Sequence, residues 1–94
     1  MEFEWDRQKD IANLSKHGFA FSEAATVFAD PLAWTIGDPD HSEEEYRYLT
    51  TGYTNERRLV IVAHTHRGGR IRIISARRAT RHERRVYEEG DRET

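Results

Sequence analysis

The sequence contains no cysteine, which excludes disulfide bonds and thiolate metal sites. A chain of 94 residues without such cross-links must be stabilised by its own core or by a partner. No apolar run approaches the ~18 residues of a membrane span, and the acidic start Met-Glu-Phe-Glu-Trp-Asp lacks the apolar segment of a secretory signal. We therefore expect one cytoplasmic domain over residues 1–94, with no membrane contact.

Signatures of nucleotide binding and of serine hydrolases are also missing. The chain has no glycine-rich phosphate loop, no Rossmann fingerprint and no G-x-S-x-G elbow. It has no visible internal repeat or low-complexity segment. Because a chain of this length buries only one modest core, it leaves no room for a deep cofactor cavity. We therefore expect a protein that uses no cofactor.

Lysine is scarce, and the basic charge is concentrated in one arginine-rich block. Residues 57–85 contain ten arginines, no lysine and one acid, for a net charge of +9, whereas residues 1–56 carry −8 and residues 86–94 carry −3. Arginine grips phosphate bidentately and stacks on bases. The block from Arg57 to Arg85 therefore predicts a surface for RNA or for an acidic partner. A solvated face neutralised by the acidic N-terminal half is the alternative.

Helix caps and turn residues divide the chain into successive elements. Asp6 and Gly18 are placed to begin and end a first helix, and Thr80 and Glu83 form a T-x-x-E capping box that opens the last one. The predicted elements are a strand at 2–5, a helix from Asp6 to about His17 with an apolar stripe of Ile11 and Leu14, a helix after Ser22 that stops at Asp30-Pro31, strands at 33–37, 46–53, 59–63 and 70–78, and a helix from 81 to about 89 that ends at Gly90.

The order of these elements indicates an α+β fold, because the helices come first and the hairpins later. The continuous apolar run Leu59–Ala63 is typical of a central strand that is covered on both faces. We predict a short N-terminal strand and two helices packed on an antiparallel sheet of three to four further strands, with a C-terminal helix. The first two helices are expected to cover one face of the sheet and to leave the other more open.

The strand at 70–78 alternates arginine with isoleucine over its first half. Because side chains alternate along a strand, Arg70 and Arg72 are expected on one face. The same alternation places Arg77 on the opposite, core-side face with Ile71 and Ile73. An arginine at the end of a strand is held by its surroundings, so we expect a basic groove around Arg77, with further arginines from the last helix.

Two histidines, His64 and His66, lie two residues apart and would share one face of a strand. A metal site would need a third ligand such as His41 or Glu45. General acid–base chemistry is better motivated, because a histidine beside arginines titrates near neutral pH. Alternatively, the two rings simply bond backbone groups at the end of the sheet. We predict no metal ligands.

Aromatic residues on the predicted strands have two interpretations. Tyr46, Tyr48 and Tyr53 could stack on bases, as RNA-binding sheets often do, whereas packing is favoured for Trp34. Tyr87 could be a phenolic acid near the arginines or a packing residue of the last helix. The acidic segment 38–45 matches no calcium-loop pattern and is interpreted as a solvated loop.

Several segments together resemble the BrnT family of type II toxins. They are Phe3-Glu4-Trp5-Asp6, Asn13-Leu14-x-Lys16-His17-Gly18, Phe21-x-Glu23-Ala24, Phe28-x-Asp30-Pro31 and Ile74-Ser75-Ala76-Arg77-Arg78-Ala79-Thr80-x-x-Glu83-Arg84. The resemblance covers nearly the whole chain in order. It implies a RelE-like fold, an RNA-cleaving activity that halts translation, and a BrnA-like ribbon-helix-helix antitoxin. It also implies a 2:2 complex with that antitoxin, through which alone operator DNA would be bound.

The resemblance and the positions of the residues give one set of candidate sites. Arg77 and Glu83 lie in the matching motif, and the other candidates follow from position alone. The predicted catalytic residues are Arg77, His64, Arg81, Tyr87 and Glu83. The predicted RNA-binding residues are Arg67, Arg70, Arg72, Arg78, Arg84 and Arg85. The leading hypothesis is a metal-independent endoribonuclease, in which arginine stabilises the phosphorane charge and His or Tyr moves protons. The alternatives are a non-catalytic RNA- or protein-binding module and a metal-dependent nuclease.

Overall fold

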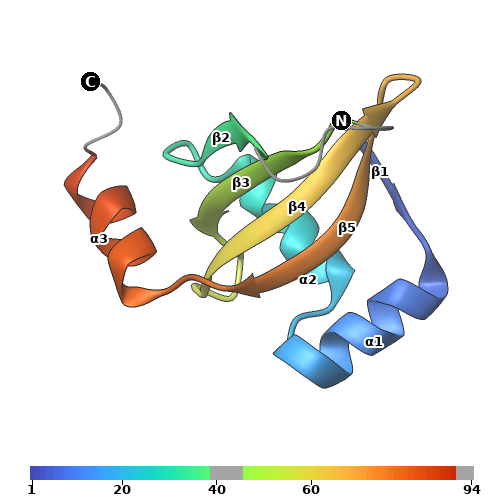
Figure 1. Cartoon of the computed structure of the whole chain (residues 1–94), viewed down its shortest axis with the longest axis horizontal. Coiled ribbons are helices and arrows are strands. Elements are labelled where there is room, and N and C mark those ends of the chain that lie inside the picture. Colours follow the sequence, from blue (N-terminus) through green and yellow to red (C-terminus); the bar gives the residue numbers. More distant parts are fainter. Residues whose placement is uncertain (39–45, 91–94) are drawn as a thin grey trace.

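A computed structural model describes residues 1–38 and 46–90 and has the predicted α+β architecture (Figure 1). The elements are β1 (Glu2–Trp5), α1 (Arg7–His17), α2 (Phe21–Ala24), the 3-10 helix η1 (Ala25–Ala29), β2 (Trp34–Gly37), β3 (Tyr48–Tyr53), β4 (Leu59–Arg67), β5 (Arg70–Arg78) and α3 (Arg81–Glu89). The five strands form one sheet in the order β1-β5-β4-β3-β2. Strand β1 pairs in parallel with β5, and the other neighbouring strands among the described residues pair antiparallel.

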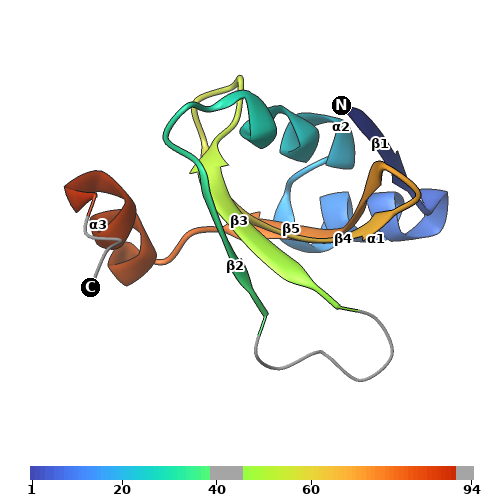
Figure 2. The same ribbon diagram turned by 90° about the horizontal axis from the view of Figure 1, so that it is seen from above.

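Helices α1 and α2 lie on one face of the sheet, as expected (Figure 2). Between them and the sheet lies the main core, which includes Phe19, Phe21 and Val27 from the helical side and Val60 and Val62 from β4. A second, smaller cluster lies at the other face. It packs Tyr87 of α3 and Ala79 against Leu59 and Ile61 of β4.

Several boundaries differ from the predicted ones. The second helix has Ala20 as its N-cap and not Ser22, and after Ala24 it continues as the 3-10 helix η1. Strand β3 begins at Tyr48 instead of Tyr46. Strand β4 continues to Arg67 instead of ending at Ala63, because its ladder with β5 runs as far as the hairpin. Backbone pairing therefore extends the strand through four residues that lack the apolar pattern.

The predicted apolar stripe of α1 is wrong, because this helix buries a polar residue. Ile11 and Leu14 are 59% and 52% exposed, whereas Asn13 is buried. The Asn13 amide donates to the carbonyls of Phe19 (2.8 Å) and Ala76 (3.0 Å), and its oxygen accepts from the Ala76 amide (3.0 Å). These bonds satisfy backbone groups that would otherwise be buried without partners. They fix α1 directly to β5.

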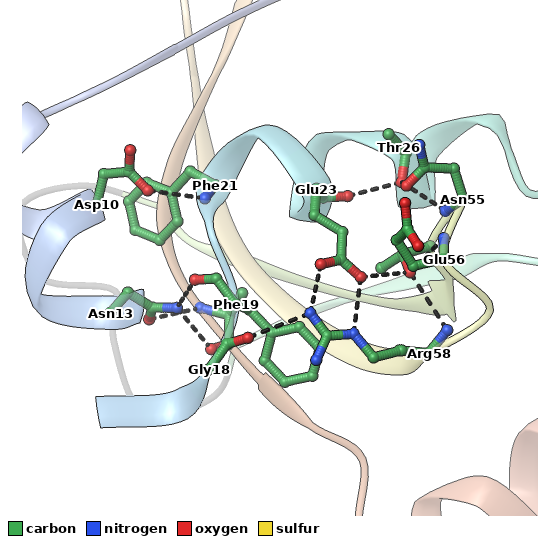
Figure 3. A network of polar contacts seen from close by, with 12 residues as sticks. Asp10, Asn13, Gly18, Phe19, Phe21, Glu23, Thr26, Asn55, Glu56 and Arg58 are labelled. Atoms are coloured by element: carbon green, nitrogen blue, oxygen red, sulfur yellow. Dashed lines mark hydrogen bonds and ion pairs between the residues drawn. The ribbon is translucent and has the colours of Figure 1, made fainter. Parts of the chain in front are cut away.

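A polar network fastens α2 to the turn between β3 and β4 (Figure 3). The Glu23 carboxylate forms an ion pair with Arg58, whose Nε donates to it over 3.0 Å, and it accepts from the Thr54 hydroxyl over 2.7 Å. The guanidinium of Arg58 also lies 4.2 Å from the centroid of the Phe19 ring. One arginine of the basic block is therefore a structural residue. Its hydrogen bond to Glu23 lowers the pKa of that carboxyl group.

A β-bulge changes the face on which Arg77 lies. Ala63 pairs with Ser75 but His64 pairs with Ile73, so Ile74 is an extra residue in β5. As a result, Ile73 and Ala76 both belong to the core on the helical side. Arg77 therefore lies on the opposite face, and the prediction that it shares the core-side face of Ile73 is wrong. A bulge shifts the alternation of a strand by one residue, which strict alternation cannot anticipate.

Candidate active site

The end of β5 and the start of α3 hold Arg77 in a fixed orientation. Its two terminal nitrogens donate to the two carboxylate oxygens of Glu83, each over 2.9 Å. Glu83 also accepts from the Thr80 amide over 2.8 Å, and the Thr80 hydroxyl accepts from the Glu83 amide, so the predicted capping box is confirmed. The hydrogen bond from Arg77 is the main reason why the pKa of Glu83 falls to about 2. The Arg77 side chain remains 43% exposed, which leaves it accessible to an anion.

An apolar pocket of about 210 Å³ lies beside this pair, on the face of the sheet away from α1 and α2. Its walls include Trp34 of β2, Leu49 and Thr51 of β3 and Ile61 of β4 on the sheet side. Helix α3 contributes Glu83, the partner of Arg77. Ile61 is also the cross-strand neighbour of Arg77. The pocket and the guanidinium are thus parts of one site.

The other predicted arginines are distributed over several places. Arg81 and Arg85 are exposed on α3, and Arg78 is exposed beside Arg77. Arg84 donates to the Tyr53 hydroxyl over 3.0 Å and lies 3.6 Å from the Glu88 carboxylate.

At the opposite end of β5 the arginines meet the carboxylates of β1. Arg70 contacts Glu2 at 3.1 Å and Glu4 at 3.6 Å, and Arg72 contacts Glu4 at 3.3 Å. Arg67 is exposed at the β4–β5 hairpin. The exposed Arg78, Arg81 and Arg85 therefore belong to the end of β5 and to α3, the elements that also carry Arg77 and Glu83. Arg67, Arg70 and Arg72 lie instead toward the β4–β5 hairpin.

His64 lies away from Arg77, because its side chain is buried against the helical side of the sheet. Its ring packs edge-on against Phe28 at a centroid distance of 4.9 Å and stacks on Tyr48. Its Nε2 and the Thr50 hydroxyl are 2.7 Å apart. Burial, with a smaller effect of the charge on His66, lowers the pKa of His64 to about 4. His64 is therefore neutral at pH 7 and 1% exposed, a geometry that suits a core residue.

Tyr87 is also buried, and its hydroxyl donates to the Asp30 carboxylate over 2.6 Å. This bond joins α3 to the segment that follows η1. The Tyr87 ring packs edge-on against the Tyr53 ring at a centroid distance of 5.4 Å. The arrangement supports the packing interpretation of Tyr87.

The metal site considered for His64 and His66 is covered only in part by the described residues. In the described ranges 1–38 and 46–90, no group of three His, Asp or Glu residues could hold a metal ion. The proposed third ligands His41 and Glu45, and most of the acidic segment 38–45, lie outside the described residues.

His82 is a candidate that the sequence analysis missed. It lines the pocket beside Glu83, in the first turn of α3. His82 lies between Thr80 and Glu83 of the T-x-x-E capping box. This position in the first turn of α3, next to the end of β5, could have indicated His82 as a candidate from the sequence. An imidazole is a suitable group for accepting and donating protons in catalysis.

Comparisons with known proteins decide the family. The family described as "Ribonuclease toxin, BrnT, of type II toxin-antitoxin system" matches residues 5–83. The chain belongs to the BrnT family. Its fold is similar to the 1.1 Å crystal structure of the Brucella abortus ribonuclease toxin BrnT, with a TM-score of 0.63 and 23% identity over 86% of this chain and 99% of that one. A search of the curated proteins finds no match.

Membership of the BrnT family places this chain among the ribonuclease toxins, for which an antitoxin partner and an RNA substrate are implied. The matched residues extend through β5 to Glu83 and so include Arg77 and its partner. None of the helices within the described residues has the length and apolar character needed to cross a membrane.

Proposed function

We propose that this BrnT-family chain is a metal-independent endoribonuclease that inhibits translation by cleaving RNA in the cytoplasm, and that residues 1–94 act as one domain. The observation that carries the proposal is the half-exposed Arg77 guanidinium, which Glu83 orients at the rim of a pocket. An oriented cation at an open site stabilises charge that develops on a phosphate without first reorganising. Arg58 is also held by both oxygens of one carboxylate, that of Glu23, and lines a hollow of its own. Its guanidinium lies over the Phe19 ring, however, and fastens α2 to the turn between β3 and β4.

The proposed reaction needs one charge to be stabilised and two protons to be moved. The ribose 2′-oxygen attacks the adjacent phosphorus, the bond from phosphorus to the 5′-oxygen breaks, and a 2′,3′-cyclic phosphate and a 5′-hydroxyl remain. We assign stabilisation of the phosphorane to Arg77 and its orientation to Glu83. We assign proton transfer to His82, because it is the histidine that lines this pocket. The burial of His64 and Tyr87 favours structural roles for both.

The exposed arginines around Arg77 support an RNA path across this end of the molecule. Arg78, Arg81 and Arg85 are exposed there, and phosphate contacts of this kind position a strand without reading its sequence. Arg84 is half-buried and donates to the Tyr53 hydroxyl, so we expect it to stabilise the fold as well as to contact RNA. Arg67, Arg70 and Arg72 lie toward the far end of β5, where the latter two are largely neutralised by Glu2 and Glu4. We expect these three to contribute less.

We further propose that the antitoxin of this chain is a BrnA-like ribbon-helix-helix protein that forms a 2:2 complex with it. Operator DNA would then be bound only through the antitoxin. The antitoxin is expected to cover Arg77, because occupying the phosphate site is the simplest way to prevent cleavage. Co-expression of the neighbouring open reading frame, followed by measurement of the mass of the complex, tests this assembly.

The catalytic proposal is tested by Arg77→Ala, with Arg70→Ala as the matched control on the same strand. RNA cleavage is measured with the purified protein in excess chelator, and growth arrest is measured on induction. We expect Arg77→Ala to lose about 10²–10³-fold in cleavage rate, as for removal of one charge-stabilising donor. Arg70→Ala should remain within a few-fold of the wild type. Full cleavage by Arg77→Ala would contradict the assignment, and loss of wild-type cleavage in chelator would contradict metal independence.

A second candidate function is non-catalytic binding of RNA or of an acidic protein. It is favoured by the fact that Glu83 already engages both terminal nitrogens of Arg77. Under this alternative the wild-type protein binds RNA tightly and the RNA is recovered intact. Gel analysis of the RNA after incubation distinguishes the two functions.

A further inference from the structure

His82 and Glu83 of the pocket beside Arg77 have roles in the reaction proposed above, but the apolar walls of that pocket have none. Its walls are Trp34, Leu49 and Ile61, closed on the other side by Val86 of α3. We infer that this pocket binds one unstacked nucleobase of the RNA, next to the phosphate that Arg77 holds. The inference rests on the proposed function, because it assumes that the phosphate at Arg77 belongs to RNA.

The size and the lining of the pocket fit a single heterocycle. Its volume of about 210 Å³ is below the ~300–1,000 Å³ of pockets that take drug-sized ligands. The indole of Trp34 and the aliphatic side chains offer apolar surface for the faces of a planar ring. The Thr51 hydroxyl offers a hydrogen-bonding group for its polar edge. An aliphatic ligand would leave this hydroxyl without a hydrogen-bonding partner from the ligand.

The position of the pocket identifies the occupant as part of the same RNA strand. Glu83 lines the pocket and also binds Arg77, and Ile61 lines the pocket and is the strand neighbour of Arg77. A phosphate on the guanidinium therefore lies within reach of a base in the pocket.

A second apolar hollow, lined by Met1, Phe3 and Phe28 among others, offers a comparison within the molecule. It is larger, about 740 Å³, and its lining includes the carboxylate of Asp30, which accepts from the Tyr53 amide and the Tyr87 hydroxyl. Neither lining contains an arginine, but the carboxylate in the smaller pocket, Glu83, is paired with the half-exposed Arg77. This adjacent cation favours a phosphate-bearing ligand at the smaller pocket.

The inference predicts the class of RNA that is cut. A base that enters the pocket must leave its stack and its pairing partner, so the substrate is single-stranded at the cut site. Cleavage should then occur at a fixed position relative to the bound base. Stacking against an aromatic surface typically strengthens binding by about 10-fold or more for each base.

The test uses an RNA oligonucleotide in which each base in turn is replaced by an abasic site. Cleavage is measured with the unmodified sugar, and binding is measured with 2′-O-methyl versions, which cannot be cleaved through the 2′-hydroxyl. The pocket is filled by Val86→Trp from α3, and by Ile36→Trp at its exposed rim in case the first variant does not fold. Ile11→Trp, on the exposed surface of α1, is the matched control.

We expect one abasic position to weaken wild-type binding and cleavage by about 10-fold or more. The filled variants should bind the intact and the abasic RNA equally, whereas Ile11→Trp should behave as the wild type. Equal sensitivity to every abasic position in the wild type, or unchanged discrimination in the filled variants, would overturn the inference. If the wild type discriminates in binding but cleaves no RNA, the pocket assignment stands and the proposed ribonuclease function fails. If the wild type cleaves RNA but is equally sensitive to every abasic position, the ribonuclease function stands and the pocket assignment fails.

Discussion

Glu83 performs two tasks with one carboxylate, because it closes the capping box of α3 and holds Arg77. The two tasks can be separated chemically. Glutamine can replace glutamate in a capping box, since its amide oxygen still accepts from the backbone of Thr80. It cannot provide the negative charge that faces the guanidinium. The variant Glu83→Gln therefore isolates the ion pair from the cap.

We expect Glu83→Gln to lower the free energy of unfolding at pH 7 by about 1 kcal/mol or less, because solvent screens a half-exposed pair. The pKa of Glu83 falls from 4.5 to about 2 on folding, so its charge stabilises the fold fully above pH 4.5. This contribution is lost as the pH falls toward 2. The difference between the wild type and Glu83→Gln, measured by urea denaturation, should therefore shrink between pH 7 and pH 3. The control is Glu88→Gln on the surface of the same helix, and a difference that stays constant with pH would contradict the prediction.

At the scale of the element, α3 depends on few contacts for its position. Tyr87 is its buried residue, and the Tyr87 hydroxyl reaches across to Asp30. The helix carries Glu83 and His82 on its first turn, so its attachment determines how well the site is formed. A buried hydrogen bond to a carboxylate is among the stronger ones in proteins.

We expect Tyr87→Phe to lower the free energy of unfolding by about 1.5–3 kcal/mol, because it removes a hydrogen bond to a charged group. RNA cleavage at a temperature where the variant is folded should stay within a few-fold of the wild type. Denaturant unfolding and a cleavage assay on the same sample measure the two effects. Tyr46→Phe, which alters an exposed tyrosine, serves as the control. A loss of cleavage of 100-fold or more by folded Tyr87→Phe would instead support the catalytic interpretation of this residue.

The elements were predictable where local chemistry determines them. The caps at Asp6, Gly18 and Thr80 marked the helix ends correctly, because a cap depends on its own side chain or on a positive φ, as at Gly18 (φ 81°). The extension of β4 to Arg67 was not predictable in this way, since pairing with β5 decides it.

The errors at the site have tertiary causes. Asn13 replaces Leu14 as the buried residue of α1 because it satisfies the backbone of Ala76, a partner 63 residues away. The bulge at Ile74 moves Arg77 to the other face, and nothing in the sequence of β5 marks it. The pair of Arg77 and Glu83 was within reach of the sequence, because both lie in one short motif, whereas the pocket requires residues from β2, β3, β4 and α3.

At the scale of the whole molecule, the acidic and basic parts of the chain are interleaved. Arg58 pairs with Glu23, and Arg70 and Arg72 pair with the carboxylates of β1. The arginine-rich block is therefore not one uniform surface. Near the pocket, the accessible positive charge of this block belongs to Arg77 and to the exposed arginines that follow it in the sequence. This distribution is consistent with an overall pI near 6.2 in a protein that is proposed to bind RNA.

The stability of the whole fold should fall at mildly acidic pH because of His64. Burial, and to a smaller extent the charge on His66, lowers the pKa of His64 from 6.5 to about 4. Between these values the unfolded chain binds a proton that the folded chain does not, so the free energy of unfolding falls as the pH decreases from 6.5 toward 4. At pH 5 the expected loss from this residue is about 2 kcal/mol, at about 1.4 kcal/mol for each pH unit.

Urea denaturation at pH 7 and pH 5 measures this loss in the wild type and in His64→Gln. The glutamine variant should be less stable at pH 7, because it loses the packing against Phe28, but its stability should change less with pH. His17→Gln, at the exposed end of α1, should keep the slope of the wild type. If His64→Gln loses as much stability between pH 7 and pH 5 as the wild type does, then another group is responsible. The pKa of the buried imidazole in the folded protein would then lie near its ordinary value of 6.5 and not near 4.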